Sequence, residues 1–345
     1  MHILNEFPGR EVKIEDKNYL YFGGTSYLGL QTNMAFQALY LKNMKRYGTG
    51  YGASRKSNIK LSVYDEVEHY LAHIVGSEQC MTMSSGYLAG QLIYQYLCKN
   101  DHKLFYAPQT HSALSNEMTN KYATILAMIT DLKKFPNQEK VILLDSIDFN
   151  GQHYPDYHWL TTIPLQHTTL VVDDSHGIGI TGINGSGSYR FLQSLNPKNL
   201  VVSCSLGKGY GIGAGAIFGA NTMIERLRDT EMYGGSSPAA PAALATIKDA
   251  EHIIHKKQLV LQKNLTLFTK NVQLPSLFKF STGHPTFSFQ NEQLTLYLEK
   301  NGIIVTNFRY PTCNDAVMSR IVISALHTAE DILTLCDTIN RFDPS

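Results

Sequence analysis

The sequence predicts an α/β fold, with a large domain built on a mostly parallel central sheet and a small α+β C-terminal domain. Along most of the chain, short β-branched runs alternate with longer amphipathic runs, a pattern typical of parallel strands joined by helices. After Pro275 this alternation gives way to short strand-like runs such as PTFSF and IIVTNF. The length of 345 residues is sufficient for two domains.

The continuous apolar runs predict buried strands, and the amphipathic runs predict the helices that cover them. The expected strands are 103–107, 141–147, 169–175, 200–205 and 215–220. The expected helices are 62–75, 87–97, 112–121, 221–228 and a long one over 239–272. Near the end, Thr328 and Asp331 suit the start of a final helix.

These elements group into three parts. We expect an N-terminal arm over residues 1–40, a large domain over 41–272 and a small domain over 273–345. The arm contains no complete βα unit, so it is predicted to pack on the small domain. A ligand is expected in a cleft between the two domains.

The composition excludes several classes of function. Thirty Lys and Arg against twenty-nine Asp and Glu give a net charge of +1, so neither nucleic acid nor a membrane surface is an expected partner. The chain has no basic-then-apolar leader and no long apolar run, which predicts a cytoplasmic protein. Five scattered cysteines without a C-x-x-C pair signal neither a disulfide framework nor a zinc site. A charged fraction of only 17% fits a large subunit interface.

A glycine-rich segment follows the strand expected over 200–205. Six of the thirteen residues from Gly207 to Gly219 are glycine, and the single lysine among them is Lys208. Such a lysine can approach a cofactor closely, but a glycine-rich turn with a solvent-facing lysine explains this segment equally well. A P-loop is excluded, because the order G-x-x-x-x-G-K-[ST] is absent.

Two acids lie near the end of the strand expected over 169–175, and a histidine follows them closely. The run LVVDDSHG places Asp173, Asp174 and His176 at the carboxyl end of an apolar strand, the edge where open α/β sheets bind ligands. Asp174 is expected to cap the next turn. Asp173, His176 and Lys208 together fit an aldehyde cofactor with a basic ring nitrogen, which needs a Schiff-base lysine, an acid and a ring-edge donor.

Seven ordered motifs make the chain resemble a known family. They are SYLGL (26–30), GTGYGASR (48–55) with YDEVE (64–68), SSGYLAG (84–90), THSAL (110–114), VDDSHGIGITG (172–182), SLGKGYG (205–211) and SRIVISALHT (319–328). In this order and spacing they resemble the α-oxoamine synthases, fold-type I pyridoxal-phosphate enzymes, and most closely their 8-amino-7-oxononanoate synthase branch. The resemblance runs from Tyr21 to about Ile332, nearly the whole chain.

The resemblance implies pyridoxal 5'-phosphate as the cofactor, bound by the large domain, and four catalytic residues. Lys208 would form the Schiff base with the cofactor, and Asp173 would hold the ring nitrogen protonated. His176 would hydrogen-bond the phenolate oxygen, and His111, in THSAL, would stack on the ring and later reach the substrate.

The cofactor phosphate has its own set of expected residues. SSGYLAG opens a helix, whose free N–H groups favour an anion, so Gly86 and Tyr87 are the expected donors. Ser205 aligns with the family's phosphate-binding hydroxyl. Gly235 and Ser236 match a segment that reaches the phosphate across a homodimer interface, although a helix-capping turn explains them equally well.

The substrate residues follow from the same resemblance. Arg309, in NFRYPT, matches the arginine that pairs with the amino-acid carboxylate, a planar group that suits a bidentate guanidinium. Arg320 is interpreted as a structural strand residue. Thr25 stands where the family has an asparagine that helps to hold this carboxylate, so Thr25 is expected at the substrate. Two further residues depart from the family pattern: Tyr64 stands in place of a histidine, and Asp148 lies near the position of the usual serine. Because of these departures, the identity of the acyl donor stays open.

The implied reaction is a C-acyl transfer in which a small amino acid condenses with an acyl-CoA thioester. Coenzyme A leaves, and in the decarboxylating members CO2 is lost, giving an α-amino ketone. The alternative keeps fold and cofactor but performs transamination or another amino-acid reaction without acyl-CoA. A third interpretation, a catalytically inactive binding subunit, disagrees with the intact set of Lys208, Asp173, His176 and His111.

Overall fold

A computed structural model describes residues 2–99, 102–148, 157–273, 275–309 and 314–343. Its contacts divide the chain into two compact units. Among the described residues, those between 35 and 251 form the central unit, and those of 2–34 and 252–343 form the terminal unit.

The central unit is built on a six-stranded sheet of order β3-β8-β7-β6-β5-β4. Its strands are β3 (Gln79–Met83), β4 (Lys103–Tyr106), β5 (Lys140–Asp145), β6 (Thr168–Asp173), β7 (Asn199–Ser205) and β8 (Gly215–Gly219). Strands β4 to β7 run parallel, whereas β8 is antiparallel to both β3 and β7. The carboxyl ends of four strands therefore meet at one edge of the sheet.

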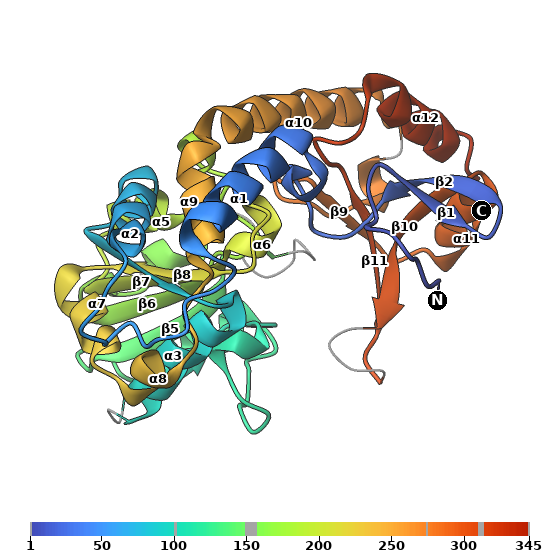
Figure 1. The fold of residues 1–345 in the computed structure, drawn as a ribbon. Helices are drawn as coiled ribbons and strands as arrows, with labels where there is room; N and C mark the ends of the chain where they lie inside the picture. Colours follow the sequence, from blue (N-terminus) through green and yellow to red (C-terminus); the bar gives the residue numbers. More distant parts are fainter. Residues whose placement is uncertain (1, 100–101, 149–156, 274, 310–313, 344–345) are drawn as a thin grey trace. The chain divides into compact units, whose positions relative to one another are not determined.

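Helices cover both faces of this sheet, with α3 on one face and α5 on the other (Figure 1). Leu92 and Ile93 of α3 pack with Val171 and Val201 of the strands in a buried apolar cluster. The helices are α1 (Met34–Tyr47), α2 (Ser62–Val75), α3 (Gly86–Lys99), α4 (Ile125–Leu132), α5 (Tyr189–Ser194), α6 (Leu206–Gly209), α7 (Asn221–Arg228), α8 (Glu231–Gly235) and α9 (Pro241–Asp249). Short 3-10 helices lie at 112–114, 158–162, 165–167 and 183–185.

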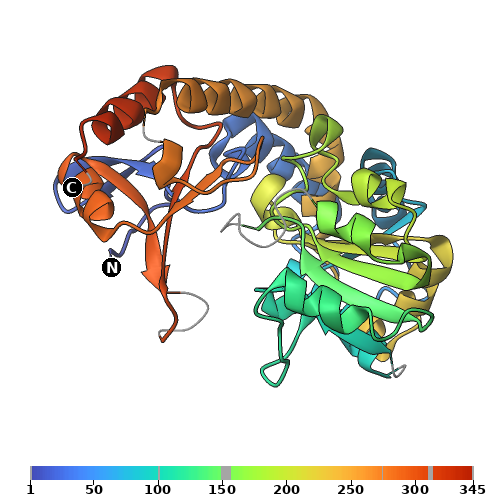
Figure 2. The ribbon, with the colours of Figure 1, turned by 180° about the vertical axis from the view of Figure 1, so that it is seen from behind.

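The terminal unit carries a five-stranded sheet of order β1-β2-β10-β11-β9, visible again from behind in Figure 2. Its strands are β1 (Glu11–Ile14), β2 (Lys17–Phe22), β9 (Thr286–Phe289), β10 (Ile303–Arg309) and β11 (Val317–Val322). The early strand β2 pairs parallel with the late strand β10, and the other pairs are antiparallel. Its helices are α10 (Glu251–Asn271), α11 (Glu292–Lys300) and α12 (Ala329–Asn340), with 3-10 turns at 30–32 and 275–277.

The start of α12 ties the N-terminal segment to the C-terminal helix. Thr328 and Asp331 form the capping box expected from the sequence. The same Asp331 carboxylate accepts two hydrogen bonds from Arg10, at 2.7 and 2.8 Å. One carboxylate therefore caps α12 and anchors the segment that precedes β1.

Several elements differ from those expected, and the helices α1, α5 and α8 were also not predicted. The predicted helix over 112–121 is a single 3-10 turn, and an unpredicted helix, α4, follows it. The long helix predicted over 239–272 is two helices, because α9 ends at Asp249 before α10 begins. Strand β3 was not expected, because its sequence QCMTM has no β-branched run. The overall fold class nevertheless agrees with the prediction.

A buried ion network joins three elements of the central unit. Glu68 on α2 is only 2% exposed and pairs with Arg55 at 2.8 Å and with Arg228 on α7 at 2.8 Å. The amide and hydroxyl of Thr82 on β3 also donate to it, each at 2.8 Å. The Arg55 guanidinium lies 4.0 Å above the Tyr64 ring. Arg55 donates a second hydrogen bond to Glu68 at 3.2 Å, so five hydrogen-bond donors converge on one carboxylate.

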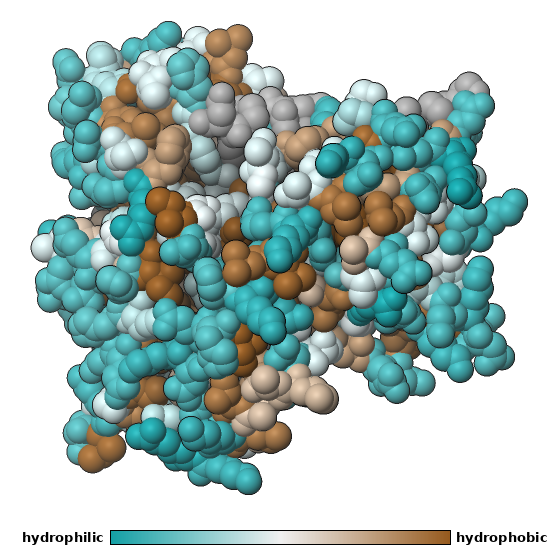
Figure 3. All heavy atoms as spheres, turned by 90° about the horizontal axis from the view of Figure 1, so that it is seen from above, coloured by the Kyte–Doolittle hydropathy of each residue, from teal (hydrophilic) through white to brown (hydrophobic). Residues whose placement is uncertain are grey.

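The surface mixes polar and apolar residues. In the view of Figure 3, apolar patches interrupt a hydrophilic surface. Large apolar side chains that are strongly exposed include Met34, Ile59, Met118, Leu126 and Ile183. Within the described part of the chain, every helix is too short or too polar to cross a lipid bilayer.

Candidate active site

Lys208 lies directly beyond the carboxyl end of β7, in the short helix α6. The Ser205 hydroxyl accepts the Gly207 amide at 3.3 Å and starts this turn. A Cβ at Gly209 would lie 2.2 Å from the carbonyl oxygen of Ile178, so glycine allows α6 to pack against the loop after β6. The Lys208 Nζ lies 2.7 Å from His176 Nε2, which brings these two predicted residues into contact.

Asp173 is the last residue of β6 and is 7% exposed. One carboxylate oxygen accepts the Ser175 amide at 2.9 Å, and the other lies 3.7 Å from Nδ1 of His111. Asp173 ends β6, and Lys208 follows β7, which pairs in parallel with β6. Parallel pairing thus gathers residues that are far apart in the sequence.

His111 is held by its main chain and by its ring. Its amide donates to the Asp145 carboxylate at 3.0 Å, and its Nδ1 accepts the amide of Ala113 at 3.1 Å. This hydrogen-bond pattern assigns the ring proton to Nε2. Burial lowers the pKa of His111, against the opposing effect of Asp173. His111 is therefore a neutral imidazole with a donor on Nε2.

Asp174 holds the loop that follows β6 through contacts of its carboxylate. Its carboxylate accepts the Ser188 amide at 2.9 Å. A Cβ at Gly177 or at Gly187 would lie 2.1 Å from its oxygens. Burial raises its pKa to about 6. The sequence analysis expected Asp174 to cap the next turn, but its carboxylate bonds the amide of Ser188, fourteen residues later and just before α5.

Gly86 and Ser205 form a tight cradle. Gly86 begins α3, a helix of 14 residues, and the Ser85 hydroxyl accepts the Leu88 amide at 3.1 Å. A Cβ at Gly86 would lie 2.6 Å from the Cβ of Ser205. The N-terminal turn of α3, including Tyr87, is thereby held against the end of β7, and helix N-termini bind phosphate.

This donor set fits the cofactor that the resemblance implies. Lys208 supplies an amine, Asp173 a buried carboxylate and His176 a ring-edge nitrogen, while the close contact at Gly86 brings a helix N-terminus beside Ser205. An aldehyde, a ring nitrogen, a phenolate oxygen and a phosphate each find a partner of matching chemistry among these residues.

Gly235 and Ser236 close the end of α8 in the central unit. The Ser236 hydroxyl donates to the Met232 carbonyl, and the Ser54 hydroxyl donates to the carbonyl of Gly234 at 2.6 Å. A Cβ at Gly235 would meet open space. These contacts are typical of a helix end. That Gly235 and Ser236 bind the cofactor phosphate in a second copy of the chain stays a prediction.

The three residues that depart from the family pattern, Tyr64, Asp148 and Thr25, lie in different parts of the structure. Tyr64 is buried and donates to the Ala239 carbonyl at 2.9 Å, so it ties α2 to the start of α9. Asp148 is 6% exposed, and the residues 149–156 that follow it lie outside the described part of the chain, as does Cys313. Thr25 is exposed in the terminal unit.

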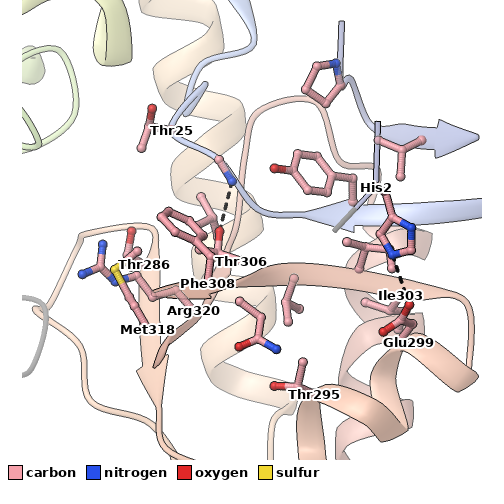
Figure 4. Close-up of a pocket in the computed structure, with 18 of the residues that line it drawn as sticks. His2, Thr25, Thr286, Thr295, Glu299, Ile303, Thr306, Phe308, Met318 and Arg320 are labelled. Carbon is pink, nitrogen blue, oxygen red and sulfur yellow. Dashed lines mark hydrogen bonds and ion pairs between the residues drawn. The ribbon is translucent and has the colours of Figure 1, made fainter. Parts of the chain in front are cut away.

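The terminal unit contains a pocket of about 480 Å³. Figure 4 places Thr25, Phe308, Met318 and Arg320 at one end of this pocket and the His2–Glu299 pair at the other. His2 and Glu299 lie 3.3 Å apart. Apolar side chains also line the pocket, including Val12, Ile304 and Val322.

The sheet register separates the two arginines. Thr306 pairs with Arg320 and Phe308 with Met318, so these four side chains share one face. Arg309 follows Phe308 directly and therefore points to the opposite face. It is exposed, and its guanidinium donates to the Asp315 carbonyl at 2.6 Å.

Arg320 is the arginine that lines the pocket together with Thr25. The sequence analysis chose Arg309 as the substrate arginine and treated Arg320 as structural. In VMSRIV the two polar residues Ser319 and Arg320 are adjacent and therefore lie on opposite faces of the strand, and the sequence alone does not say which face lines a pocket.

The chain was compared with known proteins. The family model "Aminotransferase class I and II" matches residues 17–339. The 8-amino-7-oxononanoate synthase of Buchnera aphidicola subsp. Baizongia pistaciae is 28% identical, over 99% of this chain and 96% of its own. The 8-amino-7-oxononanoate synthase of Nitrosomonas eutropha is 26% identical, and the alignment covers 93% of this chain and 89% of that protein.

Solved structures share the fold. A serine palmitoyltransferase from S. paucimobilis with bound PLP matches with a TM-score of 0.83 at 18% identity, over 99% of this chain and 91% of its own. The 8-amino-7-oxononanoate synthase of Francisella tularensis matches with a TM-score of 0.72 at 20% identity, and the match covers 94% of this chain and 97% of that chain.

Proposed function

We propose a function from one premise: the chain belongs to the aminotransferase class I and II family and is a pyridoxal-phosphate-dependent transferase. The function is that of an α-oxoamine synthase, which condenses a small amino acid with an acyl-CoA thioester and releases coenzyme A and CO2. The observation that supports it most is that curated 8-amino-7-oxononanoate synthases align over 93–99% of this chain. The contact between Lys208 and His176 beside Asp173 agrees with it.

The residues have distinct tasks in this reaction. Bound pyridoxal phosphate supplies an electron sink for negative charge at the α-carbon of the amino acid. Lys208 would hold the cofactor at its aldehyde, and its Nζ is the group that would move the proton at that carbon. Asp173 would hold a proton on the ring nitrogen. His176 would orient the ring edge.

The remaining residues orient the reactants. His111, as a neutral donor at Nε2, is suited to hydrogen-bond an oxygen of the acyl group without adding a charge. The α3 N-terminus with Gly86 and Tyr87, together with Ser205, holds the phosphate. Arg320 supplies a guanidinium for the amino-acid carboxylate, and Thr25 lies in the same pocket.

The direct test is to follow thiol release. Cofactor-loaded protein is incubated with glycine, alanine or serine, and acyl-CoA thioesters of increasing chain length are then added. We expect free coenzyme A to appear only when an amino acid and a thioester are both present, together with an α-amino ketone detected by mass spectrometry. A 2-oxo acid formed from the amino acid without thiol release would instead support the aminotransferase alternative.

The two arginines give the next prediction. Arg320→Gln is expected to raise the KM for the amino acid about 10- to 100-fold, because a charge-assisted pair contributes roughly 1.5–3 kcal/mol. Arg309→Gln, at an exposed residue on the other face, is the matched control and should change KM less than about threefold. Both variants should bind the cofactor normally. If only Arg309→Gln raises the KM strongly, Arg309 binds the amino-acid carboxylate, as the sequence analysis expected, and Arg320 does not.

The assembly and location belong to the same proposal. We propose a homodimer, which the exposed apolar side chains and the low charged fraction of 17% support. A cytoplasmic location fits the free thiols of Cys80, Cys98, Cys204 and Cys336.

A further inference from the structure

Asp145 is an acid of the candidate site that the sequence analysis did not assign. It is the last residue of β5, and its register partner on β6 is Asp173. Partners on neighbouring strands project their side chains to the same face. Two carboxyl groups therefore lie side by side at the carboxyl edge of the sheet, an arrangement that favours a proton on one of them.

Asp145 also fixes the predicted ring-stacking residue. Its carboxylate accepts the His111 amide at 3.0 Å, and this bond positions the turn in which the Ala113 amide meets the His111 ring at 3.1 Å. The ring nitrogen Nδ1 lies 3.7 Å from the other acid, Asp173. His111 is thus bonded to one carboxyl through its main chain and faces the other with its ring.

The charged groups around Asp145 come from several elements. Asp173 lies on β6, Lys208 on α6 and Lys121 in the loop before α4, and each interacts electrostatically with Asp145. Tyr157 also interacts electrostatically with Asp145. Burial, and next the charge of Asp173, raise the pKa of Asp145 to about 8, against the opposing effects of the His111 amide and the two lysines.

We propose that Asp145 is a positioning residue that carries a proton in the cofactor-free protein at neutral pH. It holds His111 through the main-chain amide, and it leaves Asp173 as the one negative charge of the pair, available to the cofactor ring nitrogen. The proposal rests on the assignment of pyridoxal phosphate to the Lys208 site and is independent of the acyl donor.

The first test uses the cofactor-free protein. A carboxyl that binds its proton more tightly when folded makes the protein less stable as the pH rises from its unfolded pKa, near 4, to its folded pKa, near 8. Asparagine cannot titrate but can still accept the His111 amide. The difference in Tm between Asp145→Asn and the wild type should therefore increase from pH 5 to pH 8 and then level off.

A matched control makes the same change at an exposed carboxylate. Asp229 has a side chain that is 94% exposed, so Asp229→Asn should follow the wild-type pH curve. If Asp145→Asn also runs parallel to the wild type from pH 5 to pH 9, Asp145 carries no such proton and the proposal fails.

The second test measures pyridoxal phosphate binding. Asp145→Asn should bind within about threefold of the wild type, whereas Asp145→Ala, which leaves the His111 amide without its acceptor, should bind at least about tenfold more weakly. Equal binding by Asp145→Ala and the wild type would overturn the positioning role, as would equally weak binding by both variants. If Asp145→Ala fails to fold, the Tm comparison with Asp145→Asn still decides the matter. Failure of acyl transfer would leave both readouts unchanged, so the two proposals fail separately.

Discussion

Replacing Lys208 with alanine is expected to lower turnover by at least about a thousandfold, because this change removes both the covalent attachment point and the group that moves the α-carbon proton. The fold should persist, since Lys208 lies in a four-residue helix at the edge of the sheet. The measurement is amino-acid-dependent thiol release, together with the visible absorbance of the cofactor before and after borohydride. Wild-type absorbance should be bleached irreversibly, whereas the variant should lose its cofactor on dialysis.

The control for this experiment is a surface lysine. Lys198 forms an ion pair with Glu139, so Lys198→Ala removes an amine without reaching the site and should keep wild-type turnover. If borohydride attaches the cofactor to Lys208→Ala as it does to the wild type, another amine carries the cofactor and the assignment of Lys208 is wrong.

Replacing Glu68 with alanine is expected to lower the free energy of unfolding by about 3–5 kcal/mol, the range for breaking a buried ion pair on one side. Arg55, whose side chain is 9% exposed, would remain buried without its carboxylate, and Arg228 and Thr82 would lose their acceptor as well. The measurement is the midpoint of urea unfolding at pH 7.

Two further variants define the origin of this loss. Glu66 lies on the same helix, with a side chain that is 50% exposed and paired with Lys248, so Glu66→Ala should cost less than about 1 kcal/mol. Glu68→Gln keeps hydrogen-bond acceptors but removes the charge and should fall between the two alanine variants. A loss in Glu68→Ala no larger than that in Glu66→Ala would show that the network contributes little to stability.

The sequence predicted the contents of the site better than its detailed geometry. Asp173 and Lys208 follow apolar runs, and parallel strands place such residues at one edge, so their proximity could be predicted from the pattern alone. Asp145 ends a strand in the same way, but in the segment that begins with it the sequence analysis singled out only Asp148. Its role depends on the register with Asp173, which the sequence does not specify.

Local hydrogen bonding explains one error. The segment over 112–121 has a helix-like apolar pattern, yet Asn116 and Thr119 bond to each other and to nearby main-chain amides. Such side-chain bonds compete with helical hydrogen bonds and favour turns. The proposal of Arg320 in place of Arg309 depends on which face each strand position occupies, and that face follows from the pairing of β10 with β11.

The pairing of β2 with β10 also has a consequence for biosynthesis. About 280 residues separate Phe22 from Ile303 in the chain, so at roughly 5–20 residues per second a ribosome needs about 15–60 s to deliver the partner of β2. During that interval the newly made β1–β2 hairpin has an open edge, and a two-stranded hairpin alone is only marginally stable. Until β10 is made, the open edge of β2 is therefore exposed to pairing with other strands, so the fold of the terminal unit is completed only late in synthesis.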